Sequence, residues 1–68
     1  MDQYALYFHE FALNISEELG DKYQSSICSN NIGVVYRRID EYYTALKFHI
    51  EALKLAVVIF SFFSARSF

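Results

Sequence analysis

The stretch SNNIGVVYRRIDEYYTALKFHIEA, residues 29–52, decides the fold because it contains two amphipathic segments on either side of a short turn. Small residues recur where two helices would have to approach each other, at Gly33, Ala45 and Ala52. Large apolar residues fill the positions between them. Apolar side chains at steps of three and four residues are typical of one helical face. The stretch therefore predicts two antiparallel helices that pack closely.

A second copy of the later half of this stretch lies upstream. Residues 4–15, YALYFHEFALNI, align with residues 44–55, TALKFHIEALKL, at a fixed offset of 40. The identical pairs are Ala5/Ala45, Leu6/Leu46, Phe8/Phe48, His9/His49, Ala12/Ala52 and Leu13/Leu53. A period of this length, built from helix pairs, is typical of a helical solenoid. The sequence therefore predicts an all-α fold of helical hairpins.

Three helices are predicted, over residues 2–19, 22–38 and from 41 to about 62, with the last few residues frayed. Gly20 supplies a left-handed residue that ends the first helix. Asp21 and Asp40 are the predicted N-caps of the second and third helices, since a carboxylate accepts from free amides of the first turn. Gly33 costs a helix roughly 1 kcal/mol relative to Ala, so a close crossing is the reason we infer for it.

The residues expected to pack between the helices combine these small positions with large apolar ones. They are Ala5, Phe8, Ala12, Ile32, Gly33, Tyr36, Tyr42, Ala45, Phe48 and Ala52.

Size and composition limit the classes of function. Sixty-eight residues form one small domain, yet six tyrosines and seven phenylalanines supply much apolar surface. A net charge of −2 does not suggest a polyanion-binding surface. The single cysteine and the lack of a secretory signal pattern fit the reducing cytoplasm. The sequence shows no phosphate loop, catalytic triad or metal-ligand motif, so we expect neither an enzyme nor a metal or other cofactor.

The chain resembles a tetratricopeptide repeat (TPR) protein, of the longer-period type found in kinesin light chains, LGN-like polarity adaptors and bacterial regulators. The match covers roughly residues 4–56, about one and a half repeats in the order second helix, first helix, second helix. The residues that carry it are Ile32, Gly33, Tyr36, Tyr42, Ala45, Ala52 and Leu53, with Ala5, Ala12 and Leu13 in the first copy. Asp40 departs from the usual turn glycine. The resemblance implies a non-catalytic scaffold that binds protein or peptide partners.

The face that the family turns towards bound peptides falls on the second helix. Its candidate residues are Ile27, Asn30, Asn31, Val34, Arg37 and Arg38. Asparagine amides can grip a partner's backbone, or can bond to a neighbouring helix or water. The two arginines can hold a carboxylate, or can simply complement the helix dipole. His9 and His49 are expected to be interior residues rather than metal ligands, because no third ligand is offered.

The tail differs from the rest of the chain. We divide the chain into a TPR-like region, residues 1–56, and an apolar tail, residues 57–68, that continues the third helix. Three interpretations of the run LAVVIFSFF, residues 55–63, stay open: packing against a second copy, the start of a membrane helix, or a non-native end. Residues expected to mediate self-association are Leu6, Tyr7, Phe11, Leu46, Ile50, Val57, Val58, Ile59, Phe60, Phe62 and Phe63.

The expected function is therefore protein–protein interaction by a TPR-like module. The alternatives are a self-assembling unit that forms a homo-oligomer through its apolar helix ends, or a segment of a membrane-tethered regulator. No nucleic-acid partner is expected.

Overall fold

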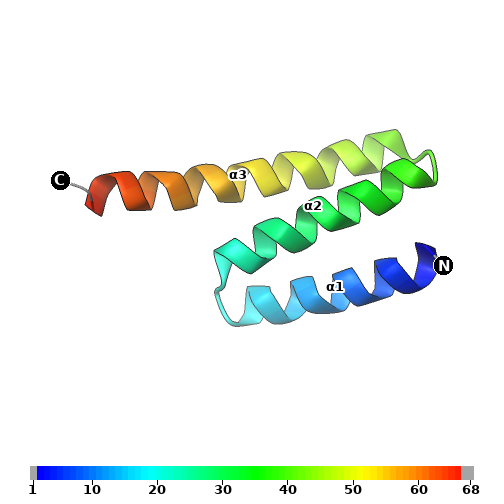
Figure 1. Ribbon diagram of the computed structural model, residues 1–68, viewed down its shortest axis with the longest axis horizontal. Coiled ribbons are helices and arrows are strands. Elements are labelled where there is room, and N and C mark those ends of the chain that lie inside the picture. The colour runs from blue at the N-terminus through cyan, green and yellow to red at the C-terminus, as the bar shows by residue number, and fades with distance from the viewer. Residues whose placement is uncertain (1, 67–68) are drawn as a thin grey trace.

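The computed structural model describes residues 2–66, which form three helices: α1 (Asp2–Glu18), α2 (Lys22–Arg38) and α3 (Tyr42–Arg66) (Figure 1). The helices lie in one layer measuring 45 × 23 × 13 Å, and each runs antiparallel to the next (Figure 1). In the described chain, every contact between helices involves α2, so α1 and α3 lie on its two sides. The predicted all-α class with three helices is confirmed.

The helix ends agree with the sequence except at the C-terminus. α1 ends at Glu18 and α2 has the predicted bounds, whereas α3 continues four residues past the expected end at Phe62. No glycine or proline interrupts residues 57–66, so nothing stops the helix there. The apolar run therefore belongs to α3 and extends beyond the start of α2 (Figure 1). The last two residues of the predicted tail lie outside the described chain.

The turn between α1 and α2 has the geometry expected of a glycine-ended helix. Gly20 is left-handed, with φ of 69°. Its N–H donates to the Glu17 carbonyl at 3.1 Å, and the Asp21 N–H donates to the Ser16 carbonyl at 2.8 Å. The Asp21 carboxylate then accepts from the Gln24 N–H at 3.0 Å. The predictions for Gly20 and Asp21 are confirmed.

The turn between α2 and α3 repeats this geometry twenty residues later. Asp40 has φ of 64°, the Asp40 N–H donates to the Arg37 carbonyl at 3.1 Å, and the Glu41 N–H donates to the Tyr36 carbonyl at 2.8 Å. The prediction that Asp40 is an N-cap is wrong, because Asp40 takes the place of Gly20. Its carboxylate instead accepts from the Tyr42 hydroxyl at 3.0 Å.

The interior follows the middle helix. The buried residues are Cys28, Ser25, Ser29, Ile32, Gly33 and Val35 on α2, with Ser16 on α1 and Ala45 and Ala52 on α3. Ile32, with no exposed surface, is the deepest of them. Beside these residues the rings of Tyr36 and Phe48 stack at 5.6 Å, which joins α2 to α3 through apolar surface.

Serine hydroxyls connect α2 to both neighbours. The Ser16 hydroxyl donates to the Leu13 carbonyl at 2.8 Å, so the Ser25 hydroxyl, also at 2.8 Å, donates to Ser16. On the other side, the Ser26 hydroxyl donates to the Ala52 carbonyl at 3.1 Å. Because buried hydroxyls are costly unless paired, these bonds allow small polar side chains to occupy the helix crossings.

The closest crossing is at Gly33. A Cβ placed there would lie 2.8 Å from atoms of the His49 ring, so any larger residue requires that ring to move. The small residues Ala5 and Ala12 of α1 are half-buried.

Two residues expected to pack between helices do not. Phe8 is 68% exposed and Tyr42 is 63% exposed, so assigning them to the interior is wrong. Phe8 lies at the edge of α1, where it borders an open hollow with Gln24 and Cys28 of α2. Tyr42 is the first residue of α3, beside the turn.

Candidate interaction surfaces

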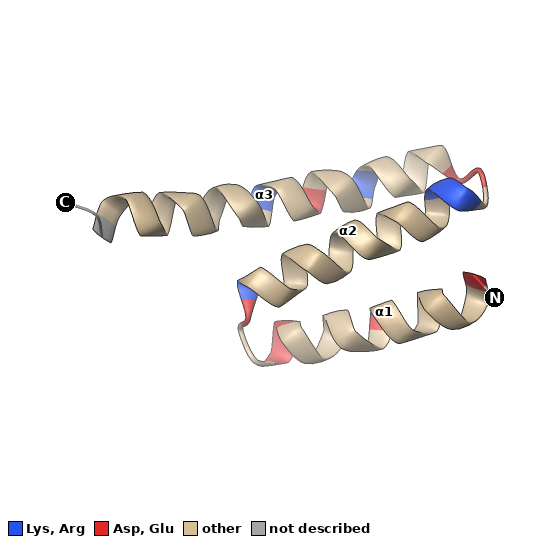
Figure 2. Cartoon of the chain, viewed as in Figure 1, with Lys and Arg blue, Asp and Glu red and all other residues tan. Residues whose placement is uncertain are grey.

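The six candidate peptide-binding residues form one stripe along α2, hereafter the α2 stripe. They follow one another at steps of one or three residues and cover about a third of the helix circumference. Asn30, Arg37 and Arg38 are exposed, Ile27 is 39% exposed, and Asn31 and Val34 are half-buried. The two arginines lie at the end of α2, where cations complement the helix dipole (Figure 2).

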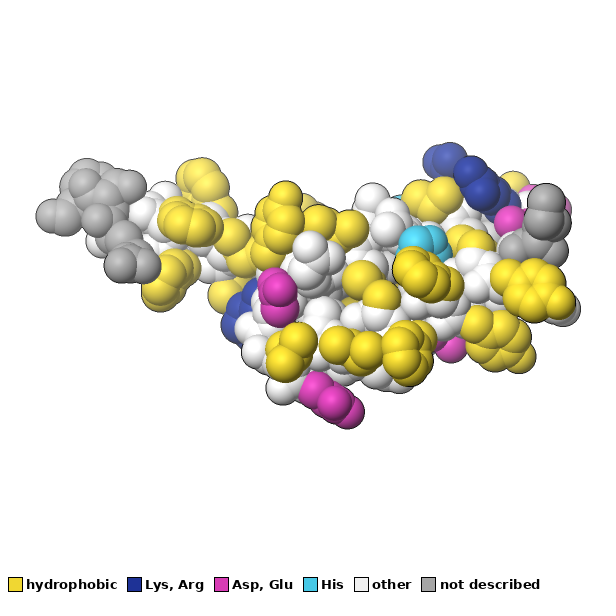
Figure 3. All heavy atoms as spheres, turned by 60° about the horizontal axis from the view of Figure 1, so that its bottom comes forward, with side chains coloured by type: hydrophobic (Ala, Val, Ile, Leu, Met, Phe, Trp, Pro, Cys, Tyr) yellow, Lys and Arg dark blue, Asp and Glu magenta, His cyan; other side chains and the backbone are white. Residues whose placement is uncertain are grey.

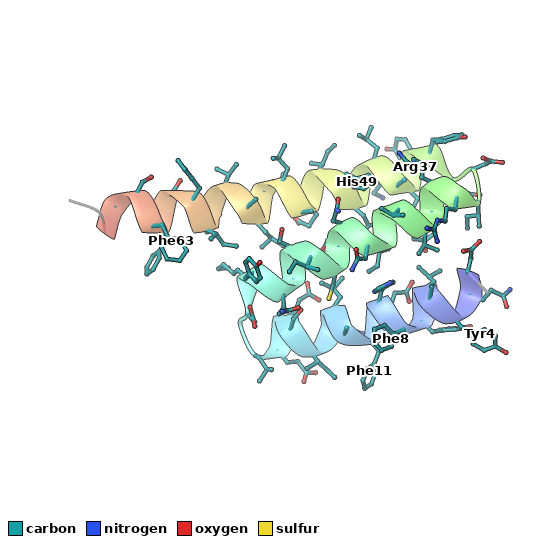
Figure 4. All side chains as sticks on the ribbon, viewed as in Figure 1. Tyr4, Phe8, Phe11, Arg37, His49 and Phe63 are labelled. Carbon is teal, nitrogen blue, oxygen red and sulfur yellow. The ribbon has the colours of Figure 1, made fainter. Side chains whose placement is uncertain are left out.

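Asn30 is already bonded to the neighbouring helix. Its Oδ1 lies 2.8 Å from His49 Nδ1, so the histidine donates this bond when Nδ1 carries the proton. The other side of the same ring contacts the backbone at Gly33. The His49 ring of α3 is thus held against α2 (Figure 4), and the α2 stripe is bonded to α3 at Asn30, near the stripe's N-terminal end.

The two repeat-related histidines lie in different surroundings. His9 contacts the Phe8 ring edge-on at 5.6 Å, while His49 bonds to Asn30. Within the described residues, no three His, Cys, Asp or Glu side chains gather closely enough to hold a metal ion. The structure therefore brings neither histidine into a ligand set.

Sequence reasoning missed a groove of about 490 Å³ between α1 and α3, with α2 as its floor. Its lining is Leu13, Glu17, Gly20, Lys22, Ser25, Ser29, Thr44, Lys47, Phe48, Glu51 and Leu55. Ser29 and Val34 differ by about 140° around a helix, so the groove opens on the side of α2 away from the α2 stripe. Its two walls are α1 and α3, which do not contact each other within the described residues. No pattern within one helix predicts how far apart two such helices lie. The only sequence feature that pointed to this groove was the pair of small residues on its floor, Ser25 and Ser29.

Cys28 is buried between α1 and α2. Burial raises the pKa of its thiol above the ordinary value, and the negative charge of Asp21 raises that pKa further. The thiol therefore stays protonated near neutral pH, and Cys28 serves as a small interior residue.

The outer face of α1 is apolar and uncovered. Tyr4, Tyr7, Phe8 and Phe11 are 66–79% exposed, and the labelled rings of Tyr4, Phe8 and Phe11 point away from α2 (Figure 4). Apolar side chains gather along this part of the surface (Figure 3). Two of the residues expected to self-associate, Tyr7 and Phe11, lie here, whereas Leu6 is half-buried.

The outer face of α3 is also apolar. Of the residues expected to self-associate, Leu46, Ile50 and Val57 are exposed on this face, and Val58 and Phe62 are exposed elsewhere on α3. Phe60 and Phe63 are exposed where they border the start of α2. Ile59 is half-buried and lines a hollow of about 290 Å³ against the start of α2. Between Tyr42 and Ala65, the charged residues of α3 are confined to the part up to Lys54 (Figure 2).

As one continuous helix, α3 is also long and apolar enough over Tyr42–Ala65 to cross a membrane, by length and composition alone. An 18-residue window within this span has a mean hydropathy of 1.6, and 6% of that window is buried. The nine-residue run by itself was too short for this, so the continuity of α3 keeps the membrane alternative open.

No protein-family profile, curated protein or solved structure matches this chain. The likeness to TPR proteins therefore rests on the residues and spacing described above and stays a prediction.

Proposed function

We propose that this chain is a non-catalytic protein–protein interaction module. The observation that supports this function is the exposure of its aromatic residues: within residues 2–66, ten tyrosine and phenylalanine side chains are each at least 58% exposed. Aromatic residues are enriched at protein interfaces, and contiguous apolar surface on a small protein marks contact sites. The single cysteine fits a reducing compartment such as the cytoplasm.

The proposed recognition face is the α2 stripe. Ile27 and Val34 offer apolar contacts, Asn31 offers amide hydrogen bonds, and Arg37 with Arg38 offers a cationic end. The resemblance to TPR proteins supports the same face. The partner that fits is a peptide segment with apolar residues followed by a carboxylate.

A peptide-display selection on the purified chain tests this face. We expect selected peptides to carry acidic residues and to shift the amide NMR signals of the α2 stripe. Replacing both Arg37 and Arg38 by Glu should weaken such a peptide at least tenfold, since two charge pairs become repulsive. The matched control, Lys22→Glu with Lys54→Glu, makes the same charge change elsewhere and should alter affinity less than threefold. Failure to select any binder, or shifts confined to the groove residues, would overturn the assignment.

The second candidate function is a self-assembling unit, and the exposed apolar face of α3 favours it. A 68-residue chain gains little interior of its own, so pairing two apolar faces would add to its stability. Sedimentation equilibrium at micromolar concentration separates the two functions. A monodisperse 8.0 kDa species would reject self-assembly and leave peptide binding in place.

A further inference from the structure

Along the face of α3 turned away from α2, apolar residues follow one another at alternating steps of three and four. They are Tyr43, Leu46, Ile50, Leu53, Val57 and Phe60, hereafter the α3 seam, of which the last residue, Phe60, also borders the hollow against the start of α2. Each is between 43% and 77% exposed. This spacing gives the a and d positions of a heptad repeat, in which one side of a helix meets a second helix.

The internal repeat shows that the seam is particular to α3. The residues of α1 forty positions earlier than Tyr43, Ile50 and Val57 are Gln3, Glu10 and Glu17. α1 and α3 share one sequence pattern, and α1 shows that this pattern is compatible with polar residues at these three positions. These three positions are polar or acidic in α1 and apolar in α3. The difference indicates that this face of α3 is suited to contact with a partner rather than with solvent.

The residue types at each position specify the geometry of pairing. Ile50 and Val57, both β-branched, occupy a positions, while Leu46 and Leu53 occupy d positions. β-Branched residues at a with leucine at d favour two parallel helices over higher oligomers. The packed side of α3, marked by buried Ala45 and Ala52, faces α2 and lies opposite the seam, so pairing leaves the three-helix layer intact.

We propose that two copies of this chain form a parallel dimer through the α3 seam, one helix of each pairing along roughly 26 Å. Stable interfaces begin at roughly 600 Å² per copy, and the seam offers six large apolar side chains, each 43–77% exposed, towards that area. This inference deepens the self-assembly candidate and is independent of the α2 stripe.

The charges beside the seam agree with the parallel direction. Lys47 and Lys54, both exposed, occupy the e positions that follow each d leucine. In an antiparallel pair the two e flanks meet, so lysine would face lysine. In a parallel pair each e residue faces a g residue of the partner. Lys47 then faces Tyr42, whereas His49, the g residue opposite Lys54, is held against α2 by Asn30. A cationic side chain is favoured beside a tyrosine ring, and Lys47 already lies 5.8 Å from the Tyr43 ring of its own helix.

Sedimentation equilibrium of the full chain in buffer tests the seam. The wild type should have twice the 8.0 kDa mass of one chain at micromolar concentration. Ile50→Glu with Val57→Glu, which restores the acidic residues of α1, should weaken the dimer at least a hundredfold and retain the helical circular dichroism of the monomer. Val57→Glu alone should still weaken the dimer at least tenfold. Its matched control, Val58→Glu, introduces the same single charge at the next position of the helix and should change the dissociation constant less than fivefold.

Phe11→Glu provides the competing test, because Phe11 lies on the other apolar face. If Phe11→Glu separates the copies while Ile50→Glu with Val57→Glu does not, α1 mediates the association and the seam is refuted. If wild type is a monomer in buffer and floats with phosphatidylcholine vesicles, lipid occupies this face and the dimer is likewise refuted. Loss of peptide binding at the α2 stripe would affect neither result.

Disulfide trapping tests the direction of pairing. In a Cys28→Ala background, Leu46→Cys places two thiols side by side in a parallel dimer, so oxidation should convert most of the chain to a covalent dimer. In an antiparallel dimer with Ile50 opposite Leu53, Leu46 would lie opposite Val57, roughly 16 Å along the helix from its counterpart. Glu51→Cys in the same background points away from the seam and should cross-link at least tenfold more slowly. A dimer in sedimentation that does not cross-link at Leu46→Cys would overturn the parallel arrangement.

Discussion

α1 and α3 carry the same sequence pattern and occupy different surroundings. Phe48 of α3 stacks on Tyr36 of α2, whereas its counterpart Phe8 in α1 is 68% exposed. α3 is packed against α2 through Ala45, Phe48 and Ala52, and α1 is packed against α2 through a rotated face that includes Ser16. An identical residue therefore does not have an identical role, because the neighbour on each side of the helix decides what is buried.

The largest expected effect concerns the contact between α2 and α3, at Gly33 of α2. Gly33→Leu should destabilise the chain by about 3 kcal/mol, because the new side chain must occupy the space of the His49 ring. Urea denaturation followed by circular dichroism measures it, at one fixed protein concentration. Val34→Leu enlarges the next residue, which lies on the α2 stripe, and should cost less than about 1 kcal/mol. Equal stability of Gly33→Leu and wild type would refute the close crossing.

The second prediction compares the repeat copies directly. Phe48→Ala should cost about 2 kcal/mol, since it removes a half-buried ring and its stack on Tyr36. Phe8→Ala, the same change forty residues earlier, should cost less than about 1 kcal/mol, because that ring is mostly in water already. Thermal melts of both variants at equal concentration decide the matter. If the two variants lose the same stability, Phe8 has a partner that a single copy does not show.

Most of the fold could be predicted from the sequence because the controlling signals are local. Apolar periodicity, Gly20 and the Asp21 cap each act within a few residues, and the helix bounds agree. Phe8 was misassigned because its identity with Phe48 indicates a shared pattern and not a shared neighbour. The end of α3 was misplaced because the amphipathic pattern stops before the helix does.

The candidate surfaces were less predictable for the same reason. The α2 stripe could be placed because it lies on one helix. The groove between α1 and α3 could not be placed, because the separation of its two walls depends on the angle at which each helix packs on α2. The bond between Asn30 and His49 joins residues nineteen positions apart and depends on that same angle.

The smallest expected effect sharpens the comparison at the two turns, where Gly20 and Asp40 have nearly equal φ angles of 69° and 64°. A residue with a Cβ is strained in this region, and glycine is not. Asp40→Gly should therefore stabilise the chain by about 1 kcal/mol, reduced by the greater freedom of glycine in the unfolded state. Gly20→Asp should destabilise it by a similar amount, for conformational reasons alone, since nothing lies within 4 Å of a Cβ at Gly20.

Exchanging Gly20 and Asp40 gives a control with the same amino-acid composition as wild type. A variant with both Gly20→Asp and Asp40→Gly has the same residues as wild type and should unfold within about 0.5 kcal/mol of it, because the sites are too far apart to couple. Tyr42→Phe removes the hydroxyl that bonds to Asp40 and isolates that exposed bond, which should contribute less than about 0.5 kcal/mol. Urea titration of these four variants completes the cycle. If Asp40→Gly is destabilising while Tyr42→Phe is neutral, the Asp40 backbone is not strained in this turn, and the two turns are equivalent in shape without being equivalent in energy.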